Sequence, residues 1–500
     1  MRVSNYVIGA PLARQPFGII LHGLIGAVDK VPRDLAVALA RNAGERVDKD
    51  EDLSALSPAD LAHLLARGYL TDLTVDQERE MMLRATADLH QNDLLTAQAS
   101  MVLIPTYRCG LRCPYCFQSH DLHAGRGEAA RLMSIAQVDQ AFGAMDHFRA
   151  PGSVARHLGL AFGSKADRHE AAPLRSVGLF GGEPLAADTV PIVEHIVACA
   201  TTRGTNVWAI TNGVELECFR HLLGPDRLAW LQITFDGMAS LHDSRRRGPQ
   251  FRTTFDRIAD NVDLALQRGV RVSVRMNVDS SNLAEIEPLT AYFEQRGWSQ
   301  APGFDVNAAV VTGESKGHKH PVTHGDLVAV TQQLADEGRN IDSYEQRARD
   351  TLRACLSGEG YPFRRVANCS AETGQLMFDP LGDVYSCWED VGTPAFRIAT
   401  YGTGGIAFDA EMAGQWLTRY PGAIEQCSVC PYALVHRSGC AAHARLQTGR
   451  LAASACEEFQ SYFPATLACA YEALEAQLMA DHDAAGNVCR SEQQREEADV

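Results

Sequence analysis

The sequence predicts an α/β protein built around a parallel sheet, because strand-like and helical patterns alternate along most of the chain. Helical patterns fall at residues 190–200, 254–267 and 283–295, between short apolar runs typical of strands. The six candidate strands are residues 101–105, 177–180, 207–211, 231–235, 270–276 and 304–309. Such a sheet is either doubly wound or curved into a partial barrel. In both arrangements the functional site lies at the carboxyl ends of the strands.

The length of 500 residues exceeds what one compact core usually contains, so several domains are expected. We place an N-terminal module at residues 1–97, the α/β core at 98–335 and a cysteine-rich domain at 336–480. Residues 481–500 are charged and rich in Gln, a composition that predicts a disordered tail.

The N-terminal module consists of short β-like runs followed by helical patterns. Ser57 followed by Pro58 predicts the start of a helix that ends near Gly68. Thr74 and Gln77 have the spacing of a capping box that opens the next helix. Strands followed by a few helices suggest a winged-helix-like fold. Because the module has no basic face, it suits a peptide better than DNA.

Composition and charge argue against several classes of protein. A hydrophobic content of 46% and a charged content of 22% are ordinary for a soluble globular protein. The net charge of −16 argues against nonspecific nucleic-acid binding, and no apolar run has the length of a membrane span. Residues 1–14 carry no secretory signal, so we expect the cytoplasm. There the 14 cysteines are expected to be metal ligands or buried thiols rather than disulfides.

Three cysteines lie close together directly after the first strand of the core. Cys109, Cys113 and Cys116 have the spacing C-x3-C-x2-C. A 4Fe–4S cluster needs four ligands, so three thiolates from one loop leave one iron open for a substrate or cosubstrate. A structural zinc site is the alternative, and it would need a fourth ligand nearby.

This motif resembles the defining motif of the radical S-adenosylmethionine (radical SAM) enzymes, whose core is a partial (β/α)6, TIM-like barrel. In that family the open iron binds SAM, and the reduced cluster cleaves it to a 5′-deoxyadenosyl radical. The radical abstracts a hydrogen atom from an inert C–H bond, while the protein positions and shields the cofactor. The resemblance covers about residues 100–460 and implies a flavodoxin- or ferredoxin-like electron donor.

Motifs after the later strands resemble the SAM contacts of this family. Gly181, Gly182 and Glu183 begin its GGEP motif, in which Glu183 accepts a hydrogen bond from the SAM ammonium group. Thr234 and Arg246 resemble the pair that holds the SAM carboxylate, although a surface salt bridge is the competing interpretation of Arg246. The complete set of expected cofactor contacts is Tyr115, Gly181, Gly182, Glu183, Asn212, Thr234, Arg246 and Asn277.

The C-terminal cysteines resemble the SPASM pattern of radical SAM enzymes with auxiliary clusters. Its first half, C-x9–15-G-x4-C, matches Cys369 to Cys387. Its second half, C-x2-C-x5-C-x3-C, begins at Cys427, and His436 replaces the third Cys. The resemblance implies one auxiliary 4Fe–4S cluster on Cys369, Cys387 and Cys440 and another on Cys427, Cys430 and Cys456. His436 either completes the second cluster or only packs beside it, and Cys355 either joins the first cluster or is buried in a helix.

These resemblances imply a maturase that abstracts hydrogen from a residue of a ribosomally made precursor peptide, forming a cross-link, a thioether or an oxidised side chain. The N-terminal module would bind the peptide's leader as an added strand. Two alternatives stay open: a sulfatase-maturase-like enzyme that forms formylglycine, and a non-enzymatic iron–sulfur scaffold that binds peptides. The sulfatase type expects Asp directly after Cys387, where this chain has Trp388. Glu389 and Asp390 follow, and they are the candidates for a catalytic base.

Overall fold

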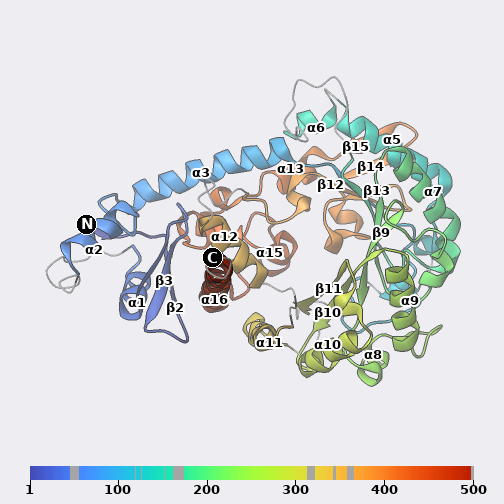
Figure 1. Ribbon diagram of the computed structural model, residues 1–500. Helices are drawn as coiled ribbons and strands as arrows, with labels where there is room; N and C mark the ends of the chain where they lie inside the picture. The colour runs from blue at the N-terminus through green and yellow to red at the C-terminus, as the bar shows by residue number, and fades with distance from the viewer. Residues whose placement is uncertain are drawn as a thin grey trace.

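Ten strands form one mixed sheet that passes through both the core and the C-terminal domain. The computed structural model describes residues 1–44, 56–118, 120–124, 127–150, 153–160, 174–311, 321–339, 341, 345–356 and 365–496. The order of the strands in the sheet is β11-β10-β9-β8-β7-β6-β12-β13-β14-β15. Figure 1 shows these strands on the right, with helix α3 leading to them from the N-terminal module.

The six strands predicted for the core are all present, and neighbouring pairs are parallel. They are β6 (Ser100–Leu103), β7 (Ser176–Leu179), β8 (Val207–Thr211), β9 (Leu228–Thr234), β10 (Arg271–Val278) and β11 (Phe304–Val310). They lie side by side in chain order, whereas a doubly wound sheet reverses its order at a switch point. The doubly wound alternative is therefore excluded.

A C-terminal hairpin extends this sheet beyond β6. Strand β12 (Gln375–Phe378) pairs in parallel with β6 and antiparallel with β13 (Asp383–Tyr385). Strands β14 (Ala399–Gly402) and β15 (Gly405–Phe408) continue the sheet. The sequence patterns did not predict that this hairpin pairs with β6. This pairing makes the cysteine-rich domain continuous with the core.

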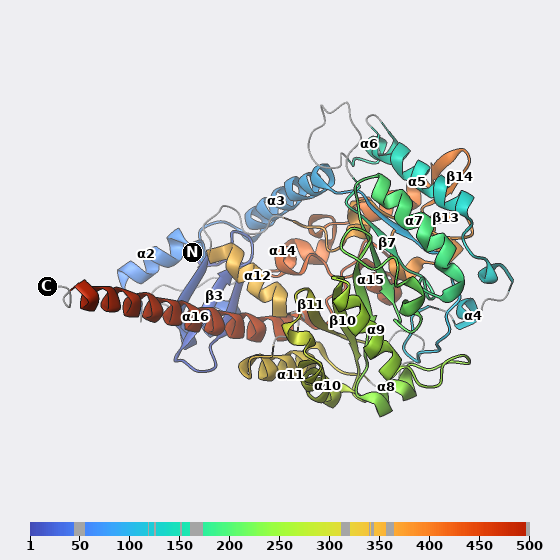
Figure 2. The ribbon, with the colours of Figure 1, turned by 45° about the vertical axis from the view of Figure 1, so that its right-hand side comes forward.

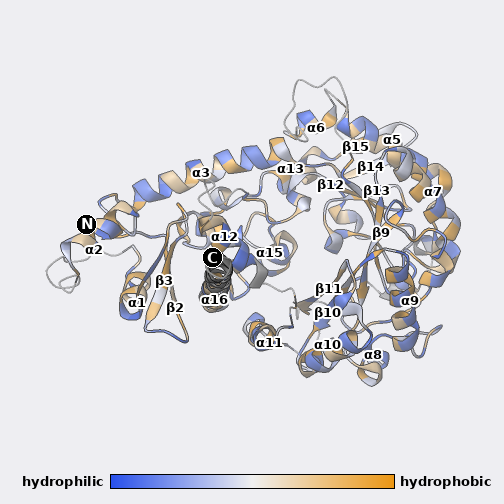
Figure 3. Ribbon diagram, viewed as in Figure 1, coloured by the Kyte–Doolittle hydropathy of each residue, from blue (hydrophilic) through white to orange (hydrophobic). Residues whose placement is uncertain are grey.

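Helices accompany the strands of the core sheet. They are α4 (His120–His123), α5 (Ile135–Arg149), α6 (Val154–His157), α7 (Val190–Thr202), α8 (Ala239–Arg245), α9 (Phe255–Gln267), α10 (Ile286–Gln295) and α11 (His324–Asp336). Of these, α5, α7, α9 and α10 bury apolar residues in the main core. Figure 3 shows α7 as mainly hydrophobic, and its buried residues join the main core. No helix in the described part of the chain is long and apolar enough to cross a membrane.

The N-terminal module contains an antiparallel sheet of β2 (Val7–Pro11), β3 (Phe17–His22) and β4 (Val28–Pro32). Its remaining elements are β1 (Arg2–Val3), α1 (Arg33–Arg41), α2 (Pro58–Ala66), β5 (Leu70–Thr71) and α3 (Val75–Thr96). The predicted helix start at Ser57 and the predicted capping box at Thr74 are confirmed, and Ser57 also forms a capping box, with Asp60. Four strands precede α1, and the short β5 lies between α2 and α3. The winged-helix-like assignment stays a prediction.

The C-terminal domain adds mainly short helices around the cysteines. They are α12 (Glu345–Leu356), α13 (Ala410–Leu417), α14 (Ala433–His436), α15 (Ala441–Thr448) and α16 (Phe459–Glu496). Helix α16 enters the segment 481–500, where the composition predicts a disordered tail. Ala, Glu, Gln and Arg in that segment are good helix formers, which explains the extension. Residues 497–500 lie outside the described part of the chain. Figure 2 shows α16 passing beside the N-terminal sheet.

A buried ion pair connects the short segments of the C-terminal domain. Arg419 and Glu372 pair with each other, and both side chains are 1% exposed. The Arg419 guanidinium also donates to the backbone carbonyls of Leu451, Ser438 and Ala453. The Arg419 side chain therefore connects three segments, which contain Glu372, Ser438 and residues 451–453.

Replacing Arg419 with Met should destabilise the protein by about 3–5 kcal/mol, because it leaves the Glu372 carboxyl buried without its charged partner. Urea unfolding followed by tryptophan fluorescence measures the effect. The matched control is Arg84→Met, which removes an exposed ion pair with Glu80 one turn away on α3. That control should cost at most about 1 kcal/mol. Equal destabilisation by the two variants would contradict the role of Arg419.

Candidate functional site

The loop that carries Cys109, Cys113 and Cys116 leaves the carboxyl end of β6 and lines a large cavity. The cavity has a volume of about 1770 Å³. All three cysteines line it, as predicted. Backbone hydrogen bonds fix the loop, including Cys109 N to His123 O at 3.3 Å and Cys116 N to Cys113 O at 3.2 Å.

The two glycines after β7 pack directly on the backbone of this cysteine loop. A Cβ atom on Gly182 would lie 2.2 Å from the carbonyl oxygen of Tyr107 and 2.3 Å from that of Arg108. Gly181 has φ +128°, which side chains rarely adopt, and its Cβ would lie 2.6 Å from Thr106 O. The glycines are therefore required for the contact between two loops, whether or not SAM is bound.

Glu183 connects the loop after β7 to the end of β8. Its carboxylate accepts hydrogen bonds from Leu185 N at 2.9 Å, Thr211 Oγ1 at 2.6 Å and Asn212 N at 2.7 Å. The side chain is 2% exposed, and burial raises the pKa of its carboxyl to about 7. Gly181, Gly182 and Asn212 line the cavity in the described structure, with Glu183 behind them. A contact between Glu183 and SAM stays a prediction.

A buried hydrogen-bonded chain joins the cysteine loop to the ends of β9 and β10. Arg246 Nη1 donates to the hydroxyl of Tyr115 at 2.6 Å, and that hydroxyl donates to Asp236 Oδ2 at 2.5 Å. Arg245 pairs with Asp279 at 2.7 Å and lies 3.6 Å from Asp236. The surface salt bridge considered for Arg246 is wrong, because this residue is 5% exposed.

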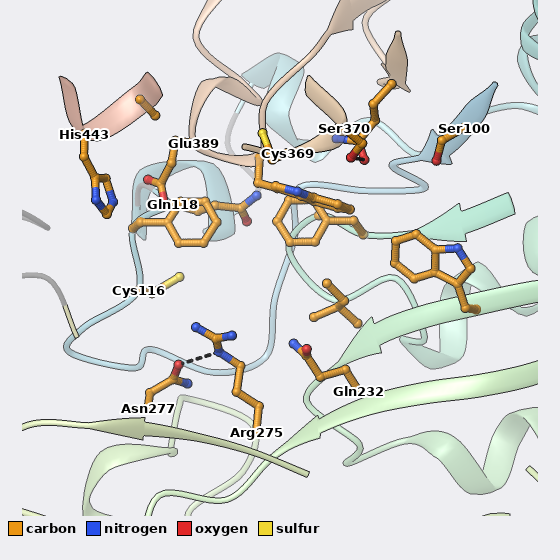
Figure 4. Close-up of a pocket in the computed structure, with 18 of the residues that line it drawn as sticks. Ser100, Cys116, Gln118, Gln232, Arg275, Asn277, Cys369, Ser370, Glu389 and His443 are labelled. Atoms are coloured by element: carbon orange, nitrogen blue, oxygen red, sulfur yellow. Dashed lines mark hydrogen bonds between the residues drawn. The ribbon is translucent and has the colours of Figure 1, made fainter. Parts of the chain in front are cut away.

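The remaining predicted contacts lie on the cavity wall at the ends of their strands. Thr234 ends β9, and Asn277 lies near the end of β10. In Figure 4, Arg275 and Asn277 point into the cavity, and Arg275 Nε donates to Asn277 Oδ1 at 2.9 Å. Seven of the eight predicted contacts line the cavity, and Glu183 is the exception.

The residues present fit the implied cluster and SAM. Asp236 Oδ1 and Arg246 Nε are buried, and the described residues offer neither a hydrogen-bond partner. Burial raises the pKa of Cys109 to about 12 and raises that of Cys113, so metal binding would displace protons from these thiols. The cavity also exceeds the usual small-molecule pocket of about 300–1,000 Å³. It therefore has room for a peptide segment besides a cofactor.

The cysteines assigned to the first auxiliary cluster lie within electrostatic reach of each other. Burial raises the pKa of Cys369 to about 12, with further contributions from Glu372 and Cys440. Burial raises the pKa of Cys387 as well, and the thiols of Cys369 and Cys440 add to the effect. Cys369 also lines the main cavity, as Figure 4 shows. The geometry is consistent with the grouping that the SPASM resemblance implies.

The thiols assigned to the second auxiliary cluster, those of Cys427, Cys430 and Cys456, also act on one another electrostatically. Burial raises the pKa of Cys430 to about 11, and the nearby thiols of Cys427 and Cys456 contribute. The ring of His436 packs on Phe459 with 4.4 Å between the ring centroids. Burial lowers the pKa of His436 to about 4, which favours the neutral imidazole that a metal ligand must have.

Cys355 differs from the cysteines of both groups. It lies on α12, which packs against α16, and burial alone raises its pKa to about 12. No cysteine thiol contributes to this shift, whereas thiols act on one another within the two groups. This favours helical burial over ligation for Cys355.

The two candidates for a catalytic base occupy different environments. Asp390 is fully buried and pairs with both terminal nitrogens of Arg445. Glu389 lines the cavity, and Figure 4 shows it beside His443. Burial raises the pKa of Glu389, and the charge of His443 acts in the opposite direction. The described geometry favours Glu389 over Asp390.

Sequence reasoning missed several residues of the site. Arg245 and Asp236 were not among the predicted contacts, although Arg246, which follows Arg245, and Thr234, two residues before Asp236, were. His443, Trp208 and Trp230 line the cavity. Successive residues of a strand point to opposite faces of the sheet. Trp208 and Trp230 are the partly buried residues between buried neighbours on β8 and β9, so this alternation could have indicated that they face the cavity.

Solved structures similar to the chain include two of anSMEcpe. One has bound AdoMet and aligns with a TM-score of 0.54 at 16% identity, covering 75% of this chain and 98% of that one. The other has bound AdoMet and the Cp18Cys peptide, with a TM-score of 0.51 and 16% identity over 76% of this chain and 98% of that one. The chain therefore has the α/β fold of these AdoMet-binding structures. This likeness is one of fold, and it agrees with the resemblance that the cysteine motif indicates.

A particular relative is also similar in sequence. The chain is 23% identical over 285 residues to the antilisterial bacteriocin subtilosin biosynthesis protein AlbA of Bacillus subtilis (strain 168). The match covers 56% of this chain and 53% of AlbA, so the chain spans about half the length of this curated relative. No protein-family model matches the chain.

Replacing Gly182 with Ala should displace the cysteine loop and lower the iron content by about four atoms per chain, the content of one 4Fe–4S cluster. The added Cβ would overlap two backbone carbonyls, which cannot move without moving the loop. Iron analysis after anaerobic reconstitution measures the effect. Gly143→Ala on α5 is the control, since its Cβ would meet nothing within 4 Å. Wild-type iron content in the Gly182 variant would contradict this prediction.

Proposed function

We propose that the chain is a radical SAM maturase with SPASM auxiliary clusters that modifies a ribosomally made precursor peptide. The observation that carries the proposal is a single cavity lined by all three parts of the molecule. The Cys109–Cys116 loop and the predicted SAM contacts form one wall, Cys369 and Glu389 form a second, and residues of α3 form a third. When bound, the cluster and SAM would supply radical chemistry at an unactivated C–H bond of the peptide.

The chain's own residues would hold the cofactors and exclude water. Tyr115, Asp236 and Arg246 would fix the wall beside the cluster, since they form a continuous hydrogen-bonded chain. Aromatic side chains that line the cavity would exclude water from the reacting bond. Trp388 packs edge-on against Phe180, with 4.7 Å between the ring centroids, and both line the cavity.

The finer features of the fold belong to the same proposal. The consecutive order of β6 to β11 supports a partial (β/α)6, TIM-like barrel. The strands followed by helices in residues 1–97 support a winged-helix-like module. We further propose a flavodoxin- or ferredoxin-like protein as electron donor and the cytoplasm as the place of reaction.

The sulfatase-maturase-like alternative has weaker support. It requires a carboxylate directly after Cys387, and Trp388 occupies that position. The likeness to anSMEcpe concerns the fold, whereas the sequence match is to a bacteriocin biosynthesis protein. These observations favour maturation of a peptide. The non-enzymatic scaffold is a poorer fit, because the predicted SAM contacts surround a cavity of sufficient size.

Anaerobically reconstituted protein should contain about twelve irons per chain, the content of three 4Fe–4S clusters, and should release 5′-deoxyadenosine from SAM with dithionite. Cys116→Ala should retain about eight irons and lose this activity, because it removes a ligand of the loop cluster only. Cys218→Ala is the control, since Cys218 is exposed and lies apart from the three groups. About four irons in the wild type would refute the auxiliary clusters, and failure to cleave SAM would favour the scaffold.

The N-terminal sheet offers an edge for the leader of the precursor peptide. The strand order is β2-β3-β4, and α16 packs on the face of this sheet, where it contacts β2 and also pairs with Lys30 of β4 through Glu475 at 2.8 Å. Strand β4 lies at the other edge and is only partly buried along its length. An edge strand has unpaired backbone groups that can accept another strand. We therefore propose β4 as the binding edge.

Adding the precursor peptide should slow hydrogen exchange at the backbone amides of β4 that point away from β3. These amides gain hydrogen-bond partners only if the leader adds as a strand. Exchange measured by mass spectrometry on the complete chain checks this, with buried helix α9 as the internal control. The complete chain is needed because the module contributes buried residues such as Tyr6 to a core shared with α16. Protection elsewhere in the module, with β4 unchanged, would contradict the proposed edge.

A further inference from the structure

Three potential metal ligands meet on the outer surface of the core, away from the cavity. His195 and Cys199 lie one turn apart on α7, so their side chains share one face of the helix. Asp139 reaches them from α5, which packs beside α7 in Figures 1 and 2. All three ligand atoms lie within 4.8 Å of one another.

The arrangement differs from that of a nucleophile–histidine–acid relay. In such a relay the acid holds Nδ1 of the imidazole and the nucleophile faces Nε2. Here Asp139 Oδ1 lies 2.6 Å from His195 Nε2, and Cys199 Sγ lies 3.6 Å from the same nitrogen. The acid and the thiol therefore converge on one ring nitrogen, as ligands of a shared cation do.

The distances are close to those of a tetrahedral zinc site. Zinc bonds of about 2.3 Å to sulfur and about 2.0–2.2 Å to nitrogen and oxygen place a sulfur about 3.6 Å from its neighbouring ligands. The sulfur of Cys199 lies 3.6 Å from His195 Nε2 and 3.9 Å from Asp139 Oδ1. The nitrogen–oxygen pair is shorter, and the Asp139 side chain is 59% exposed, so it can move outward.

The charges around the trio are compatible with a cation. Arg203, one turn beyond Cys199, donates to Asp146 Oδ2 at 2.7 and 3.1 Å and to Asp146 Oδ1 at 3.3 Å. Asp146 also pairs with Arg149 at 2.6 Å, so it neutralises the charge of Arg203 only in part. Burial raises the pKa of the Cys199 thiol, and the charge of Arg203 acts to lower it. An entering metal ion would release the thiol proton to solvent as the sulfur–metal bond forms.

We propose that Asp139, His195 and Cys199 form a binding site for a divalent transition metal, with Zn²⁺ as the best match. The donor set of one thiolate, one imidazole and one carboxylate suits this ion. Because the site is at the surface, water completes the coordination. The metal would join α5 to α7, and it is independent of the iron–sulfur clusters and of the proposed enzymatic function.

Zinc binding to the reconstituted protein, with its clusters in place, tests the proposal. One Zn²⁺ per chain should bind in competition with a chromophoric chelator. The zinc K-edge absorption spectrum should show one sulfur at about 2.3 Å and nitrogen or oxygen ligands at about 2.0–2.2 Å. This spectrum is element-specific, so the iron of the clusters does not obscure it.

Cys199→Ser and His195→Ala should each weaken zinc binding at least 100-fold, because even an outer partner of a ligand contributes about 10- to 100-fold. Cys218→Ser, at another cysteine on the core surface, is the matched control and should bind as the wild type does. Two results would overturn the proposal. One is unchanged affinity in the Cys199 and His195 variants, and the other is a zinc spectrum with several sulfur ligands, which would place the ion in a cluster site.

Discussion

The close contact between the cysteine loop and the two glycines after β7 is the constraint on which the whole site depends. Gly182 N donates to Thr106 O at 3.1 Å and Glu183 N donates to Arg108 O at 2.8 Å, so two loops run together beyond the end of the sheet. Glu183 then binds the backbone at the end of β8. Hydrogen bonds thereby connect the segment after β6 to the segment after β7, and the segment after β7 to the end of β8. The protein itself sets the position of the loop that presents the thiols, and a metal would bind to a loop that is already held.

Local patterns in the sequence predicted the features that depend on local physics. Buried apolar runs marked all six core strands, and Ser57 and Thr74 marked the starts of two helices. The position of polar residues after each strand also predicted that distant motifs would meet at one edge of the sheet. The cavity confirms that expectation for Asn212, Thr234 and Asn277. The SPASM resemblance implied two groups of cysteines, and within each group the thiols raise one another's pKa.

What the sequence did not reveal depends on partners that are far apart in the chain. Strand β12 pairs with β6 across more than half of the chain, and no local pattern specifies that register. The same limit applies to Glu183. The motif indicates a contact with SAM, whereas in the fold the Glu183 carboxylate accepts three hydrogen bonds from the protein itself. It also applies to Asp390 and Glu389, which are adjacent in sequence. Asp390 forms a buried ion pair with Arg445, whereas Glu389 lines the cavity, and the two roles can be told apart only from the position of Arg445 in the fold.

Helix α3 links the N-terminal module to both groups of auxiliary cysteines. Near its start, Arg79 donates to the side chain of Ser428, which lies between Cys427 and Cys430, at 3.1 Å. Near its end, Asp93 accepts from the amides of Val366 and Ala367, at 2.8 Å each, just before Cys369. A helix of 22 residues spans about 33 Å, so one rigid element touches both cysteine groups.

Modules that bind peptides often move relative to the domain that they serve, unless a large apolar interface fixes them. Here the interface is apolar and shared. Tyr6 and Ile8 of the module belong to the same buried cluster as Phe459 and Phe463 of α16, and the Tyr6 hydroxyl donates to Ser428 O at 2.8 Å. The edge strand β4 is therefore held at a fixed distance from the cavity. On the proposed function, the length of peptide between the bound leader and the modified residue would then be set by this rigid geometry, and selection of the target would depend on spacing as well as on side-chain chemistry.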